Sequence, residues 1–143
     1  QNLRLNPETG IVAAVDGSIN GGTAPTVSSV AYSGNVSGSA ATVLYDIDVA
    51  SNKLFKQNPP NNGTLVEVGS LGITATGESG FDISPDGKTA LAALTVGGKQ
   101  TLYQIDTTSG KATALGIFGA GDNITGIAIP TNPVAYAPYL LIA

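Results

Sequence analysis

The chain has 143 residues, of which 42% are hydrophobic and only 11% are charged, so its composition suits one folded domain. Its formal charge is −4 and its six basic residues are scattered singly, which excludes a basic surface for nucleic acid. The absence of cysteine excludes disulfides and thiolate metal sites. No apolar run reaches the roughly 18–20 residues that a membrane span needs. We therefore expect no nucleic-acid partner, no membrane span and no cofactor.

Glycine and proline divide the chain into short segments that alternate apolar and polar residues, as β-strands do. The first two segments predict a hairpin across a proline-led turn, at residues 2–6 and 11–15. Two four-stranded antiparallel units follow, the first at 27–33, 42–48, 53–57 and 64–69, and the second at 79–84, 89–96, 100–106 and 112–118. A last pair of strands is predicted at 124–129 and 136–142. No segment has a helical period, so the chain is predicted to be all-β.

The grouping of these strands predicts a β-repeat domain over residues 1–130, built as a partial β-propeller or an open array of blade-like repeats. Its parts are a half blade at 1–16, blades at 27–69 and 79–118, and a half blade at 124–142, with an apolar C-terminal tail at 131–143. Propellers have typically about 4 to 8 blades, so these parts cannot close a ring alone. Three arrangements stay open: a fragment of a longer propeller, two copies that close a six-bladed ring, or copies joined end to end. An ordinary sandwich is the alternative if the blade phase is wrong.

Two short motifs recur along the chain. Leu-Tyr-Asp-Ile-Asp at 44–48 recurs as Leu-Tyr-Gln-Ile-Asp at 102–106, and each copy is followed by serine and lysine at the same spacing. A weaker copy opens the chain, where Asn6 stands in the place of Asp48 and Asp106. The second motif occurs at 28–32, 79–83 and 125–129. Similarity repeated at such spacing is typical of blades.

Four strings of the sequence carry a family resemblance. They are Asn-Leu-Arg-Leu-Asn-Pro-Glu-Thr-Gly at 2–10, Ala-Val-Asp-Gly at 14–17, Leu-Tyr-Asp-Ile-Asp at 44–48 and Gln-Asn-Pro-Pro-Asn-Asn-Gly-Thr-Leu at 57–65. On these strings the chain resembles, from Gln1 to about Pro130, a family of exported bacterial domains of unknown function. Its members are propeller-like and longer, and some carry cell-surface sorting signals. The resemblance implies an extracellular β-repeat protein, and it supplies no activity or site.

The sequence cannot assemble the usual combinations of nucleophile and base, because it has neither histidine nor cysteine and no Gly-x-Ser-x-Gly elbow. Asp46 and Asp48 share one strand face and could bind Ca²⁺ or act as acid and base. Asp48 and Asp106, however, end strands before turns, where aspartate accepts backbone N–H bonds. We favour the turn role, since calcium needs roughly six to eight oxygen ligands. A two-carboxylate glycosidase stays formally open among Asp46, Asp82, Glu67, Glu78 and Asp122. We expect that the protein is not an enzyme.

Three Asn-x-Ser/Thr sequons lie at or beside predicted turns and are possible glycosylation sites: Asn35, Asn62 and Asn123. The apolar tail supplies a second group of candidates. Its residues Tyr136, Tyr139, Leu140, Leu141 and Ile142 are possible assembly contacts. The tail either packs as the closing strand of its own domain or inserts into a neighbouring copy by strand addition.

Two classes of function remain. We expect a non-catalytic extracellular structural protein that self-associates through unpaired edge strands into a surface or filamentous assembly, so that its partner is a homo-oligomer or filament. The alternative is a glycan- or small-molecule-binding propeller fragment of a longer exported protein. Most aromatic residues fall at core-like positions, which favours the structural class: Tyr32, Tyr45, Phe55, Phe81, Tyr103 and Phe118.

The composition also leads to an expected location. The chain begins at Gln1, contains no methionine and is rich in serine, threonine, asparagine and glycine. We therefore expect the mature part of an exported bacterial protein, extracellular or on the cell surface.

Overall fold

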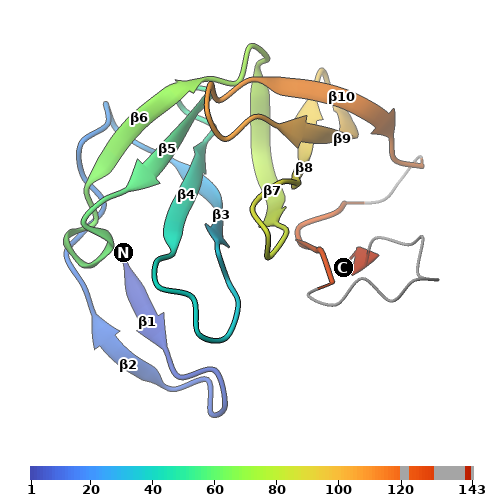
Figure 1. Cartoon of the computed structure of the whole chain (residues 1–143). Coiled ribbons are helices and arrows are strands. Elements are labelled where there is room, and N and C mark those ends of the chain that lie inside the picture. Colours follow the sequence, from blue (N-terminus) through green and yellow to red (C-terminus); the bar gives the residue numbers. More distant parts are fainter. Residues whose placement is uncertain (120–122, 131–140, 143) are drawn as a thin grey trace.

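The computed structural model describes residues 1–119, 123–130 and 141–142 of the chain. Within these residues the protein is all-β, with antiparallel sheets of two and four strands that do not close into a barrel (Figure 1). The one helical element described is a single 3₁₀ turn, η1 (Pro60–Asn62). The predicted fold class is thus confirmed. No helix in this part of the chain is long and apolar enough to cross a membrane.

The strands form four sheets in chain order. The first is the hairpin β1 (Leu3–Leu5) and β2 (Val12–Val15). The first four-stranded sheet has the order β3 (Val27–Ser33), β4 (Val43–Asp48), β5 (Lys53–Gln57) and β6 (Leu65–Ser70). The second has the order β7 (Ala75–Ile83), β8 (Ala90–Val96), β9 (Lys99–Ile105) and β10 (Ala112–Ile117). The last is the pair β11 (Ile127–Ala128) and β12 (Leu141–Ile142).

The observed strands differ from the predicted ones at two places. β7 begins at Ala75 rather than at residue 79, because a register shift between Thr76 and Gly80 lets the strand continue along β8 as far as Val96. β11 covers only two of the residues predicted at 124–129. Residues 136–140 of the predicted last strand lie outside the described residues. The division into a domain and a tail at residue 131 therefore stays a prediction.

The core lies between the two four-stranded sheets, which pack face to face with β3 beside β7. Ile47 and Leu54 of the first sheet and Leu94 of the second are fully buried in it. Burying an apolar side chain of this size contributes about 1.5–3 kcal/mol to stability. Polar contacts add to the contact between β3 and β7, where the hydroxyls of Ser28 and Ser29 lie 2.6 and 2.7 Å from the hydroxyl of Ser79. Both sheets are therefore held as one layered unit.

The Leu-Tyr-x-Ile-Asp motif marks a type of turn and not a fixed place in the repeat. Residues 44–48 lie on β4, the second strand of its sheet, whereas residues 102–106 include the end of β9, the third strand of its sheet. The two copies share only their turn, so their spacing is not the period of the fold. The second motif gives that period, because 28–32 and 79–83 lie on the first strands β3 and β7. Its third copy, 125–129, contains β11.

The turn role predicted for the aspartates is confirmed. Asp106 Oδ1 accepts the backbone N–H groups of Thr108 and Ser109, at 2.8 and 3.3 Å. Asp48 accepts those of Ala50 and Ser51 in the same way, at 3.3 and 3.0 Å. These bonds fix the turn that follows each of the two strands.

Candidate functional site: an uncovered sheet face

The first strands of the repeats differ in how well they are covered. The second motif aligns Val30 of β3 with Phe81 of β7 and Ile127 of β11. Phe81 is 6% exposed and Ile127 is 9% exposed, because each lies against the sheet before it. Val30 is 51% exposed, since no described strand lies in front of β3. The outward face of β3 therefore carries an apolar side chain at a position that is buried in the other repeats, but here it is exposed. We call it the open face of β3.

The next outward residue of β3 repeats this contrast. Tyr32 aligns with Ile83 of β7, which is 3% exposed, but Tyr32 itself is 43% exposed. The prediction that Tyr32 occupies a core-like position is thus wrong. Tyr45, Phe55, Phe81 and Tyr103 are buried as predicted, and Phe118 is half-buried. Alternation correctly placed Tyr32 on an apolar face, but it does not reveal whether a neighbour covers that face.

The hairpin β1–β2 has the geometry of the outer half of a four-stranded sheet. In its turn, Asn6 N–H donates to Ile11 O and Gly10 N–H donates to Asn6 O, both at 2.8 Å. The turn between β9 and β10 contains the same pair of bonds, from Asp106 to Lys111 at 2.9 Å and from Gly110 to Asp106 at 2.7 Å. Since this turn also follows β4, the chain order places the hairpin: β2 leads into β3 as β6 leads into β7, so β1 and β2 stand where the third and fourth strands of a sheet would be.

The side chains of this hairpin are less covered than their counterparts. Leu3 and Leu5 of β1 are exposed, whereas the corresponding Tyr103 and Ile105 of β9 are buried. β9 has β8 beside it, but β1 pairs only with β2 among the described strands. One edge of β1 is thus without a strand, next to the open face of β3.

A cavity of about 320 Å³ lies between the hairpin and the first sheet. It is lined by apolar and polar side chains from both, among them Leu3, Arg4, Asp16, Val30, Tyr32 and Gln57. Its position is where the first two strands of a preceding sheet would pack, in front of β3 and beside β1. The cavity is thus part of the same incomplete surface.

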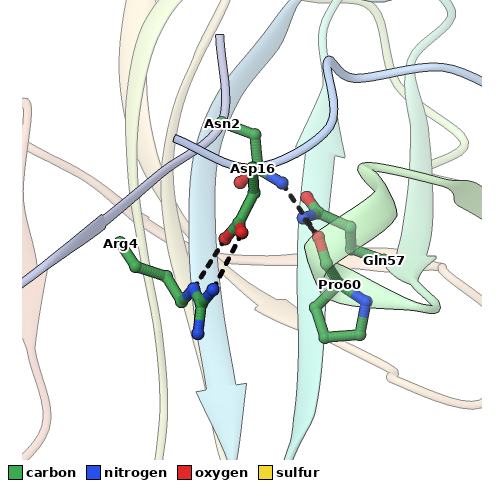
Figure 2. Close-up of polar contacts among 5 residues, drawn as sticks. All are labelled: Asn2, Arg4, Asp16, Gln57 and Pro60. Carbon is green, nitrogen blue, oxygen red and sulfur yellow. Dashed lines mark hydrogen bonds and ion pairs between the residues drawn. The ribbon is translucent and has the colours of Figure 1, made fainter. Parts of the chain in front are cut away.

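Polar contacts hold the hairpin in place beside this cavity (Figure 2). Arg4 forms two hydrogen bonds to the Asp16 carboxylate, from Nε at 2.8 Å and from Nη2 at 3.0 Å. The Asp16 carboxylate raises the pKa of Arg4, mainly through these hydrogen bonds. Asn2 Nδ2 and Gln57 Nε2 both donate to the carbonyl of Pro60, at 2.8 and 2.6 Å. The bond from Asn2 ties the hairpin to the turn after β5.

Asp46 lies beneath the open face and differs from its neighbour Asp48. In the strand register Val30 is opposite Asp46, and Asp46 is opposite Phe55, so the three side chains share one face. Asp46 is fully buried and neither of its carboxylate oxygens has a hydrogen-bond partner. Burial raises its pKa to about 7. Asp48, in contrast, also accepts the backbone N–H of Thr26 at 2.5 Å and the hydroxyl of Ser51.

The carboxylates that stayed formally open as metal ligands or catalytic groups have different surroundings. Asp46 and Asp48 share a face, but Asp48 is fully engaged in its turn and Asp46 has no second ligand group beside it. The described residues contain no cluster of three side chains that could hold a metal ion. Of the formally possible glycosidase acids, Asp82 accepts the backbone N–H of Ile129, Glu67 pairs with Lys53, and Asp122 lies outside the described residues.

The strand β11 is anchored on the opposite side of the second sheet. Ile129 N–H donates to Asp82 Oδ2 at 2.5 Å. The side-chain amide of Gln100 binds the backbone of Ile124 twice, donating to its carbonyl at 2.6 Å and accepting from its N–H at 2.5 Å. With Ile127 buried against β7, this strand covers the second sheet as β7 covers the first.

The remaining predicted site residues are distributed over the surface and the C-terminal segment. Asn35, Asn62 and Asn123 are all exposed, so their glycosylation stays a prediction. Leu141 and Ile142 form β12 and pair with Ala128 and Ile127 of the same chain. Tyr136, Tyr139 and Leu140 lie outside the described residues. The sequence analysis did not identify Val30, Tyr32 and the Arg4–Asp16 pair as a site. The alignment of the second motif could have identified Val30 and Tyr32.

The comparisons with known proteins give a family and no activity. No curated protein and no solved structure is detectably similar to the chain. The family model described as Domain of unknown function (DUF4394) matches residues 1–128. This match covers nearly all of the described strands, from β1 to β11. The chain therefore belongs to the DUF4394 family of domains of unknown function.

Proposed function

We propose that this protein is a non-catalytic extracellular structural protein that self-associates through its unpaired strands into a surface or filamentous assembly. One observation carries the proposal: Val30 and Tyr32 are exposed where the aligned residues of β7 are buried. Apolar surface of this kind is stabilised by contact with another β-strand layer, and an open strand edge such as that of β1 recruits one.

The non-catalytic part of the proposal is supported by how the acidic residues are used. Asp48, Asp82 and Asp106 all bind backbone N–H groups, which is a structural role. The sequence has no histidine or cysteine to serve as a base or nucleophile. Asp46 has a perturbed pKa, but it is sealed from solvent and from any substrate.

The extracellular part is supported by surface chemistry. Only 11% of residues are charged, and the three sequon asparagines are exposed. A bacterial exported origin is consistent with this composition and with the family resemblance. Mass spectrometry of the protein from its native source tests whether Asn35, Asn62 or Asn123 carries glycan.

Light scattering over a concentration series tests the self-association. We expect the protein to be larger than a 14.2 kDa monomer at micromolar concentration. The double variant Val30→Asn with Tyr32→Asn should be monomeric, because it removes the apolar character of the open face. The matched control, Val66→Asn with Leu115→Asn, changes two similarly exposed apolar residues on the outer strands β6 and β10 and should still associate. A wild-type protein that stays monomeric and unfolds cooperatively contradicts the proposal.

A second candidate, binding of a glycan or small molecule, is favoured by the composition of the cavity. There the half-exposed ring of Tyr32 lies among the polar side chains of Asn2, Arg4 and Gln57. A concave site with one aromatic and several hydrogen-bonding groups suits a sugar. Saturable binding on a glycan array by a monomeric protein, lost in Tyr32→Ala, would favour this candidate over assembly.

A further inference from the structure

We propose that the open face of β3 is covered by the β11–β12 pair of a second copy of this chain, and that β12 of that copy pairs with β1. This inference rests on the proposed self-association and specifies how the copies meet. The resulting sheet has the order β11–β12–β1–β2, with two strands from each copy.

The two ends of the chain supply complementary halves of one sheet. β1 and β2 match the third and fourth strands of a four-stranded sheet, because β2 leads into β3 as β6 leads into β7, and β1 is antiparallel to β2 as β5 is to β6. β11 matches the first strand, since its motif aligns with β3 and β7 and it packs on β7 as β7 packs on β3. β12 is antiparallel to β11, as β4 is to β3. Together the halves reproduce the strand order of β3 to β6.

The contact between β3 and β7 shows how β11 would fit. There the small Ala31 of β3 packs in the same core as the large Phe81 and Ile83 of β7. In the composite sheet Ala128 of β11 takes the place of Ala31, because the motif aligns these two alanines. Ala128 is exposed in the single chain. It would face Val30 and Tyr32, the aligned partners of Phe81 and Ile83. A small side chain would thus again pack against large ones.

The chain cannot make this contact with itself. Its own β11 is held against the second sheet by Ile127 and by the bond from Ile129 to Asp82. The hairpin β1–β2 and the C-terminal strands lie on opposite sides of the two four-stranded sheets (Figure 1). The contact therefore joins different surfaces of two copies, and repeating it gives either a closed ring or a filament.

Disulfide trapping tests the contact directly, because the chain has no cysteine of its own. Val30→Cys and Ala128→Cys are prepared as separate proteins, unfolded in denaturant, mixed, refolded together and then oxidised. We expect a covalent species of twice the 14.2 kDa chain mass only in the mixture, since each variant alone places its cysteine opposite an unchanged residue. The matched control mixes Ala128→Cys with Val66→Cys, a similarly exposed valine on β6, and should give no such species.

Light scattering on the same samples separates the possible failures. If the copies associate but residues 30 and 128 do not cross-link above the control, this pairing is wrong while the proposed self-association stands. If the protein is monomeric, both fail. In a monomer, slow reaction of the Val30→Cys variant with a thiol reagent would show that another segment of the same polypeptide covers β3, which also overturns the second copy as its occupant.

Discussion

At the scale of single residues, the two aspartates of β4 show how position along a strand decides the state of a carboxyl group. Asp48 lies at the strand end, where backbone N–H groups of the following turn reach it. Asp46 lies two residues earlier, where the backbone N–H groups belong to the sheet. Its carboxyl group is buried without a partner, which favours its neutral form.

Asp46 makes stability depend on pH. Its pKa rises from 3.8 in the unfolded chain to about 7 in the folded one, so between these values the folded state keeps a proton that the unfolded state has lost. The free energy of unfolding should therefore fall as pH rises from about 4 to 7, by up to about 4 kcal/mol, and stay level above. Urea unfolding of wild type and Asp46→Asn from pH 4 to 8 measures this: their difference should change across that window. A constant difference would falsify the raised pKa.

The turn aspartates should differ in importance according to burial. Asp48→Ala removes the acceptor of several bonds at a buried site and should lower the free energy of unfolding by roughly 2–4 kcal/mol. Asp106→Ala removes equivalent bonds at an exposed turn, where water replaces them, so its loss should be smaller. Thermal unfolding of both variants gives the comparison, and equal losses would show that burial is not the deciding factor.

Asp106 adds an opposite pH dependence. Hydrogen bonds from the Thr108 backbone and from Ser109 lower its pKa below the ordinary value. Its contribution to stability is therefore present above that ordinary value and is lost as pH falls through the lowered one. Asp106→Asn serves as the matched control for Asp46→Asn in the same urea unfolding series, since its difference from wild type should stay constant between pH 4 and 8 and change only at lower pH.

At the scale of elements, the turns stabilise the fold as the strands do. Gly63 and Gly87 both have positive φ, at 67° and 70°, as the sequence Asn-Asn-Gly and Pro-Asp-Gly predict. A Cβ added at Gly63 would also meet the carbonyl oxygens of Gly17 and Ser18 at 2.5 Å, whereas one at Gly87 would meet nothing within 4 Å. The first turn is therefore packed against the chain and the second is not.

Alanine at these two glycines should separate backbone strain from steric contact. Gly87→Ala should lower the free energy of unfolding by about 1 kcal/mol, the cost of the left-handed conformation alone. Gly63→Ala should cost more, about 2–4 kcal/mol, because the β2–β3 connection must also move away. Chemical denaturation measures both losses. Similar values for the two variants would mean that the connection yields easily.

The strands and turns could be predicted because their signals are local. Alternation and Gly/Pro punctuation placed the strands from β1 to β10, and the position of Asp48 and Asp106 before Ser and Lys predicted their turns. Because the turn signal is local, it does not show the period of the repeat. An aspartate turn can follow a strand in any hairpin. The Leu-Tyr-x-Ile-Asp motif therefore appears on strands that are not equivalent.

The exposure of the site could not be predicted, because it depends on what lies in front of a strand. Val30 and Phe81 occupy the same place in their repeats and are both apolar. Only the arrangement of sheets shows that one is covered and the other is not. The same holds for Asp46, because its position on β4 does not show that its side chain is fully buried.

At the scale of the whole molecule, Val30 and Tyr32 make the open face of β3 apolar, and this predicts how the proposed assembly should respond to salt. The charged pair beside it, Arg4 and Asp16, is satisfied within the hairpin. Raising the ionic strength from about 0.1 to 1 M shortens the Debye length from about 10 to 3 Å and should leave assembly unchanged or stronger. Light scattering at the two salt concentrations checks this, and dissociation at high salt would point instead to an interface held by charges.

The half sheets at the two ends of the molecule would affect how fast assembled copies exchange, rather than how tightly they bind. A contact that completes β1–β2 with β11–β12 joins copies through backbone hydrogen bonds within one sheet, and not through side chains between sheets. Such bonds are directional and neighbouring ones support each other, so they have to break nearly together. Copies joined in this way should exchange slowly once assembled, and dilution should release them over a long residence time.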